Sequence, residues 1–124
     1  MKLENKIKML AEFVGFVETE FDKDMFYYPA NWNLDPIDDD KFELDIHYEN
    51  MEFRYSFDWL MKVLDKVYIP YTISMSYEKN TDTYRVLIRA LDDDGQMKSF
   101  NNATNDKIES LFRTIVELTE ELRI

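Results

Sequence analysis

His47 is the only histidine of the chain and therefore the first candidate for acid–base chemistry near neutral pH. Asp45 and Glu49 lie two residues away on either side and could orient its imidazole as a general base. Against catalysis, no serine or threonine lies in a nucleophile motif such as G-x-S-x-G, and a lone histidine in an acidic strand is more often simply exposed. The absence of cysteine also removes thiolate zinc sites and a cysteine nucleophile. We therefore expect no enzyme and no catalytic residue.

Two aspartate-rich runs, Asp92 to Asp94 and residues 35–40, could offer hard oxygen ligands to calcium or magnesium. An EF-hand loop needs alternate ligands, a central glycine and a late glutamate, and neither run has that spacing. The favoured interpretation is a type I′ hairpin turn at Asp94-Gly95 and a solvated acidic loop around Asp38. The only two glycines belong to no cluster, which excludes a glycine-rich phosphate loop. The sequence therefore predicts no metal site and no cofactor.

Residues 21–32 are the most unusual segment, because six aromatic or methionine side chains stand among carboxylates there. Such a mixture can grip a basic partner, since rings contribute contact area and carboxylates pair with arginine and lysine. In the alternative interpretation the aromatic residues fold back as a lid on the core, and the acids only solubilise it. The candidate partner-binding residues are Glu20, Asp22, Asp24, Tyr27, Tyr28, Trp32, Asp38, Asp39, Asp40, Glu43 and Asp45.

The formal charge of the 124-residue chain is −11, and it is unevenly distributed. Residues 18–58 hold thirteen acidic and three basic side chains, a net charge of −10, which leaves −1 for the remainder. Phosphate binding requires lysine and arginine to displace counterions, so bare nucleic acid is disfavoured as a ligand. A partner with a basic surface is favoured instead.

Two stretches in the first half of the chain carry apolar residues at helical spacing. The stripe in residues 2–14 stops before Gly15, which is suited to the left-handed conformation that ends a helix. The stripe in residues 57–67 follows Ser56, a suitable N-cap, and stops before Pro70, which blocks continuation. We expect a helix in each stretch.

Strand patterns occur in both halves. Residues 71–77 and 84–90 alternate apolar and polar side chains, which predicts an antiparallel hairpin with one buried face, and residues 96–100 are long enough for a third strand. A further, possible hairpin comprises residues 42–46 and 51–55. The outward positions of the main sheet form a polar and basic face that could receive an anion or the chain's own acidic segment, unless it is a plain solvated face. These positions are Thr72, Ser74, Ser76, Arg85, Arg89 and Lys98.

A last apolar stripe in residues 108–122 predicts a closing helix, capped by Thr104, Asn105 or Asp106. The order of helix, irregular acidic stretch, helix, meander and helix predicts an α+β fold for a single domain of residues 1–124. We expect the antiparallel sheet, a three-stranded meander plus the possible extra hairpin, to pack against about three helices.

Three separated segments resemble the phage ABA sandwich domain, a family found in bacteriophage proteins. Residues 6–15 (KIKMLAEFVG) are similar to its opening helix, which ends at a glycine; residues 57–67 (FDWLMKVLDKV) resemble its tryptophan-leucine-methionine helix; residues 106–117 (DKIESLFRTIVE) resemble its closing helix. Lys62 stands where the family pattern has a proline, and residues 17–55 match no part of it. The resemblance implies a sheet between helices and a phage origin, and it carries no activity over.

These observations favour an acidic, phage-type accessory or counter-defence protein that binds and inhibits a basic host protein. Its carboxylates could act as a nucleic-acid mimic by occupying a nucleic-acid channel where phosphates would lie. No stretch reaches the length of a membrane span, so we expect no membrane association and a cytoplasmic location, in the host cell if the protein is phage-encoded. The alternative is a homo-oligomeric structural or scaffold domain, such as a homodimer, without catalytic activity. Its subunit contacts would come from Met9, Phe13, Phe16, Trp59 and Val63.

Overall fold

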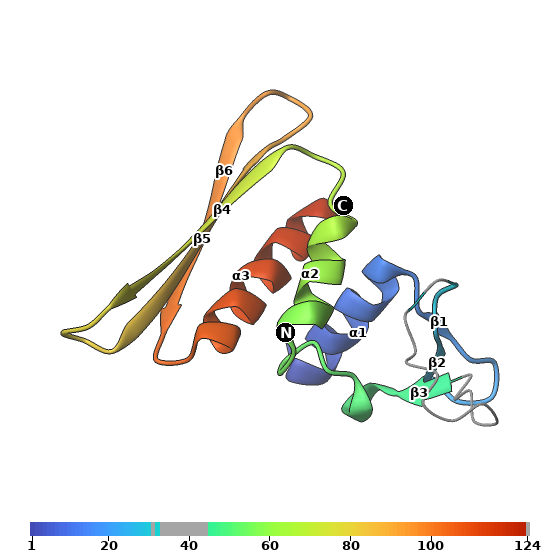
Figure 1. The fold of residues 1–124 in the computed structure, drawn as a ribbon. Coiled ribbons are helices and arrows are strands. Elements are labelled where there is room, and N and C mark those ends of the chain that lie inside the picture. Colours follow the sequence, from blue (N-terminus) through green and yellow to red (C-terminus); the bar gives the residue numbers. More distant parts are fainter. Residues whose placement is uncertain (31, 33–44, 124) are drawn as a thin grey trace. The chain divides into compact units, whose positions relative to one another are not determined.

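The computed structural model of the chain describes residues 1–30, 32 and 45–123, and it confirms the α+β class (Figure 1). The described residues contain three α-helices and two three-stranded antiparallel sheets. In chain order the elements are α1 (Leu3–Val14), β1 (Val17–Glu18), β2 (Met25–Tyr27), β3 (Asp45–His47), the short 3₁₀ helix η1 (Tyr48–Asn50), α2 (Phe57–Asp65), β4 (Tyr71–Glu78), β5 (Thr83–Leu91), β6 (Met97–Thr104) and α3 (Lys107–Leu122).

The chain forms two compact units, Met1–Met51 and Glu52–Ile124. The first unit holds α1 with the sheet β1-β2-β3, and the second holds α2 and α3 with the sheet β4-β5-β6. A single domain therefore stays a prediction, and each unit is described by itself. No helix in the described part of the chain is long and apolar enough to cross a membrane.

In the first unit, α1 ends where the sequence predicts, at Gly15. This residue has a left-handed backbone with φ of 106°, and its N–H donates to the carbonyl of Glu12 at 3.1 Å. The N–H of Phe16 donates to the carbonyl of Ala11 at 2.9 Å, so the last turn of the helix keeps its hydrogen bonds. A side chain at Gly15 would meet the ring of Pro29, because an added Cβ would lie 3.3 Å from Pro29 Cβ.

The first sheet is small and has its apolar centre on β2. Phe26 pairs with Glu18 of β1 and with Ile46 of β3, and both Phe26 and Ile46 are buried. Burying an aromatic side chain contributes on the order of 2–3 kcal/mol relative to leaving it in water. Phe26 and Ile46 therefore anchor these three short strands to the unit.

The prediction of a strand over residues 51–55 is wrong, because these residues form a turn. The N–H groups of Tyr55 and Ser56 both donate to the carbonyl of Glu52, at 3.0 and 2.8 Å, which closes a turn into α2. Met51 and Phe53 are buried and Tyr55 is exposed, so the alternation reflects two anchoring side chains around a turn and not the face of a sheet. The partner strand predicted over residues 42–46 is described only from residue 45, where β3 pairs with β2 instead.

The second sheet, which is the main sheet of the protein, is the predicted meander, with β5 between β4 and β6. Helix α3 packs against β5 and β6 and covers the buried side chains of β5, which are Val86, Ile88 and Ala90. Helix α2 packs against α3 (Figure 1). The N-caps also follow the predictions, because Ser56 Oγ accepts from the Trp59 N–H at 3.3 Å and Asp106 Oδ1 accepts from the Glu109 N–H at 2.9 Å.

The turn between β5 and β6 differs from the predicted type I′ turn. A type I′ turn needs a positive φ at both central residues, but here Gly95 alone adopts one, with φ of 79°. The Gly95 N–H donates to the Asp92 carbonyl at 3.0 Å, and the Asp92 N–H donates to the Gln96 carbonyl at 2.9 Å. This pattern is that of a type I turn followed by a glycine bulge, which adds one residue to the loop and pairs Leu91 with Met97.

Candidate protein-binding site

The loop between β1 and β2 is fixed by one buried hydroxyl group. Thr19 is almost completely buried, and its hydroxyl donates to the Asp22 carbonyl at 2.8 Å and accepts from the Asp22 N–H at 3.3 Å. Its backbone N–H donates to the Met25 carbonyl at 2.9 Å, beyond the last pair of the strand ladder. The Asp24 N–H in turn donates to Asp22 Oδ1 at 2.9 Å. The loop therefore has a defined shape.

Lys8 of α1 anchors the same loop through charge. Its Nζ lies 2.6 Å from Asp24 Oδ1, 2.8 Å from Glu4 Oε1 and 4.8 Å from the ring centroid of Tyr48. Desolvation lowers the pKa of Lys8, but the hydrogen bonds to Asp24 and Glu4 outweigh it and raise the pKa above its ordinary value. The hydrogen bond from Lys8 also holds the pKa of the Asp24 carboxyl below its ordinary value. Asp24 is therefore a structural anchor.

The acidic loop, residues 18–22, presents an aromatic ring among carboxylates. Phe21 is 66% exposed, although phenylalanine is usually buried. Glu18, Glu20 and Asp22, its neighbours in the sequence, are exposed as well. Phe21 and Glu18 are not among the site residues predicted from the sequence, although Phe21 belongs to the aromatic segment of residues 21–32 and Glu18 to the acidic segment of residues 18–58.

Two predicted site residues belong to the interior of the first unit. Tyr28 and Trp32 are half-buried, and their ring centroids lie 5.4 and 4.9 Å from that of Phe16. Phe16 itself is buried, as are Met9 and Val63, so these three side chains are not exposed for the apolar subunit contact that the scaffold alternative assigns to them. For Tyr28 and Trp32 this packing agrees with a lid of aromatic residues over the core.

The remaining predicted residues lie on the first sheet and its loop, or outside the described residues. Tyr27 is half-buried, and its hydroxyl donates to the Glu20 carboxylate at 3.2 Å; desolvation and this hydrogen bond raise the pKa of Tyr27. Asp45 is half-buried at the start of β3, directly opposite Tyr27. The structure thus brings Glu20, Asp22, Tyr27 and Asp45 to one small sheet and its loop. The other predicted acids, Asp38, Asp39, Asp40 and Glu43, lie outside the described residues.

His47 has a local structural role. Its Nδ1 accepts the Glu49 N–H at 3.2 Å and so caps η1, and its ring lies 4.7 Å from that of Tyr48. An imidazole nitrogen that caps a helix is not available as a general base in the same geometry. Among the described residues, no cluster of three histidine, aspartate or glutamate side chains could hold a metal ion.

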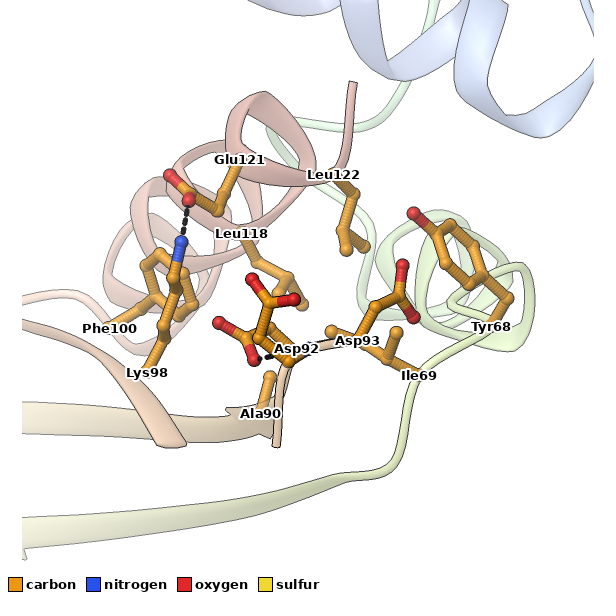
Figure 2. A pocket seen from close by; sticks show the side chains of 11 residues that line it. Tyr68, Ile69, Ala90, Asp92, Asp93, Lys98, Phe100, Leu118, Glu121 and Leu122 are labelled. Atoms are coloured by element: carbon orange, nitrogen blue, oxygen red, sulfur yellow. Dashed lines mark hydrogen bonds and ion pairs between the residues drawn. The ribbon is translucent and has the colours of Figure 1, made fainter. Parts of the chain in front are cut away.

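The second unit has a cavity of about 260 Å³ at the end of the main sheet (Figure 2). Its apolar lining includes Ile69, Phe100 and Leu118. Figure 2 shows Lys98 and Glu121 on one side, and Asp93 with Tyr68 on the other. Pockets for drug-sized ligands are about 300–1,000 Å³, so this cavity has the size for a side chain of a partner.

The exposed edge of this cavity carries negative charge from Asp93 and Asp94. Lys98 Nζ bonds the Glu121 carboxylate, which raises the pKa of Lys98 and neutralises both groups. Asp92 uses Oδ1 to accept the N–H groups of Asp94 and Gln96, at 3.0 and 2.7 Å. Asp93 and Asp94 are exposed, so the rim carries net negative charge above an apolar floor.

Six residues are predicted to lie on the outer face of the main sheet. Five of them do, and Lys98 is the exception. The register places Thr72 beside Arg89 and Ser76 beside Arg85 on this face, whereas Lys98 pairs with Ala90 on the side of α3. The extra residue in the Gly95 bulge shifts β6 by one position relative to a type I′ hairpin, and a shift of one residue reverses every side chain.

No family model, curated protein or solved structure matches the chain. The resemblance to the phage ABA sandwich domain stays a prediction.

Proposed function

We propose that the protein is a non-enzymatic binding module for a protein partner with a basic surface, and that the acidic loop is its contact surface. The observation that supports this best is the exposure of Phe21, 66%, between exposed carboxylates of Glu20 and Asp22. A phenylalanine held in water loses on the order of 2 kcal/mol of burial free energy, which a partner restores. Carboxylates around the ring select a partner that offers arginine or lysine.

The distribution of charge supports the same chemistry. Residues 1–51 contain thirteen acidic and five basic side chains, a net charge of −8, and residues 52–124 carry the remaining −3. One of the five basic residues, Lys8, is already paired with Asp24 and Glu4. A field of one sign accelerates the encounter with oppositely charged partners and is weakened by salt.

The cavity of the second unit offers a further contact of the same kind. A lysine side chain has an apolar stem and a cationic end, and here an apolar floor that includes Ile69 and Leu118 lies below the exposed acids Asp93 and Asp94. The acidic loop and the cavity therefore favour the same class of partner.

The proposal extends to a biological setting. A basic protein that binds nucleic acid would be inhibited when carboxylates fill its channel, and a phage-type accessory or counter-defence protein would act in this way. Two observations support a phage-type role: the acidic composition, and the three segments that resemble helices of the phage ABA sandwich domain.

The test measures binding to a fluorescent deca-arginine peptide and to basic proteins captured from bacterial lysate, each at low and high salt. The Phe21→Ala variant should bind at least about tenfold more weakly, since about 1.4 kcal/mol of lost burial corresponds to one decade of affinity. Tyr55→Ala is the matched control, because Tyr55 is also an exposed aromatic residue, 71% exposed, outside the acidic loop.

A second pair of variants separates specific recognition from bulk charge. Glu18→Gln, Glu20→Gln and Asp22→Asn combined should weaken binding and reduce its salt dependence, whereas the same change in charge at Asp65, Glu117 and Glu120, exposed acids of α2 and α3, should have a smaller effect. Equal losses for both sets, or salt-independent binding, would refute recognition by the acidic loop.

A further inference from the structure

Strand β4 forms an edge of the main sheet. In the described part of the chain it pairs with β5 alone, over eight residues from Tyr71 to Glu78. Natural edge strands are usually protected from pairing by lysine, proline, a bulge or a covering element. β4 contains no lysine or proline between Tyr71 and Glu78, and Glu78 at its end is its only charged residue. Its backbone edge is therefore suited to receiving another strand.

The inner face of β4 adds apolar surface to this edge. Helix α3 packs against β5 and β6, and the inward residues of β4 stay partly exposed, Met75 to 39% and Tyr77 to 50%. The ring of Tyr77 lies 4.6 Å from that of Tyr84 on β5, so it already packs along the sheet. The other inward residue in this part of β4, Ile73, is half-buried.

The outer face of the sheet provides charge for the occupant to match. Arg89 is exposed on β5 and lies beside Thr72 of β4. Glu78 is exposed on β4, and the alternation of side chains places it on the same face as Thr72. A strand that brings a carboxylate opposite Thr72 would put it in one row with Arg89, with only the short threonine side chain between them.

We infer that this occupant is a second copy of the chain, with β4 pairing antiparallel to β4 so that Met75 lies opposite Met75. This register puts Glu78 of the second copy opposite Thr72 and within reach of Arg89, and the two-fold symmetry repeats the ion pair. On the inner face it puts Ile73 opposite Tyr77 of the second copy, an aromatic and β-branched pair that stabilises antiparallel sheets. The result is a continuous sheet of six strands.

Neighbouring registers lack this match. The inward side chains of both copies must lie on the same face of the joined sheet. The nearest other registers that keep this arrangement are centred on Ser74 or on Ser76. Centred on Ser74, Glu78 lies opposite Pro70; centred on Ser76, it lies opposite Ser74, whose neighbour on β5 is Leu87. The register centred on Met75 is thus the one that joins Glu78 to Arg89 over almost the whole length of β4.

The absence of cysteine in the natural chain allows a direct test by cross-linking. Opposed residues of an antiparallel pair have Cα atoms about 4.5–5.5 Å apart, within the range that a disulfide bridges. Under mild oxidation, Met75→Cys should form a covalent dimer much faster than Met97→Cys, an exposed residue (61%) on the other edge strand, β6. Equal rates for the two variants would refute the interface.

Light scattering coupled to size-exclusion chromatography, over a range of protein concentrations, should find a dimer for the natural chain. Met75→Lys should be monomeric with its circular dichroism spectrum unchanged, whereas Met97→Lys should stay dimeric. Arg89→Glu should weaken the dimer, and Glu78→Arg added to it should restore it. A monomer at every concentration, or a dimer indifferent to these changes, overturns the inference. Basic-peptide binding by the acidic loop is tested separately and can succeed or fail independently.

Discussion

The ammonium group of Lys8 lies 2.6 Å from the carboxylate of Asp24, and this ion pair joins α1 to the loop that follows β1. The helix and the loop are separated by β1 in sequence, so the contact is tertiary. Because Lys8 also bonds Glu4 of α1, one lysine pairs with a carboxylate of its own helix and with Asp24, which follows the acidic loop.

This pair predicts a specific dependence of stability on pH. The pKa of Asp24 is lowered from 3.8 in the folded state, so its contribution is complete above the unfolded pKa and is lost as the pH falls through the folded pKa. Asp24→Asn should therefore destabilise the protein at neutral pH, and the difference from the natural chain should vanish in acid. Urea denaturation from neutral to acidic pH measures the free energy of unfolding of both proteins. Glu12→Gln, which removes an exposed carboxylate of α1, is the control. A difference that persists unchanged in acid would contradict the assignment.

Gly15→Ala should lower the free energy of unfolding by about 1–2 kcal/mol, because an alanine would be forced into a left-handed backbone. Its Cβ would also press on Pro29 at 3.3 Å. Gly95→Ala is the matched control: φ is also positive there, but nothing lies within 4 Å of the added Cβ. Thermal denaturation should rank Gly15→Ala as the less stable variant, and the reverse order would contradict the role of Pro29.

Ser110→Ala should destabilise the second unit by about 1–3 kcal/mol, since it removes a buried hydroxyl that connects three elements. Ser110 Oγ on α3 accepts the Thr104 N–H of β6 at 3.0 Å and donates to the Tyr84 carbonyl of β5 at 2.8 Å. Ser99→Ala on the exposed outer face of β6 is expected to be nearly neutral. Chemical denaturation of both variants compares them directly.

Thr119→Val should increase the free energy of unfolding by about 1 kcal/mol, because a buried hydroxyl without a partner is unfavourable. Among the described residues, Thr119 Oγ1 is the one buried side-chain polar atom that makes no hydrogen bond. Thr114→Val, five residues earlier on α3, should have the opposite effect, since the Thr114 hydroxyl donates to the Ser110 carbonyl at 2.8 Å. Opposite shifts in melting temperature confirm the distinction, and equal shifts contradict it.

Elements with long apolar periodicity could be predicted from the sequence. Helix α1 and the meander follow the pattern closely, and Ser56 caps α2 as expected, because these features depend on neighbours in the sequence. The strand prediction for residues 51–55 fails because two buried residues at a turn, Met51 and Phe53, give the same alternation as a strand. Local pattern does not report where the backbone hydrogen bonds go.

Which residues of the candidate site are exposed depends on tertiary contacts, and these cannot be predicted from neighbouring residues in the sequence. Tyr28, Trp32 and Phe21 have similar composition around them, but the first two pack on Phe16 whereas Phe21 stays exposed. The sequence pattern predicts the wrong face of the sheet for Lys98, because one bulge residue, Gly95, determines the register of the whole strand β6. In both cases a single distant contact or turn decides the outcome.

The hydroxyl of Thr19 has a consequence for the energetics of association. A loop that becomes ordered only when it meets a partner loses conformational entropy at that moment, and this loss weakens the complex. The loop around Phe21 is already held by Thr19, by the backbone bond to Met25 and by the pair of Asp24 with Lys8. Its ordering is therefore completed during folding, and a Thr19→Val variant would carry this entropic cost over to binding.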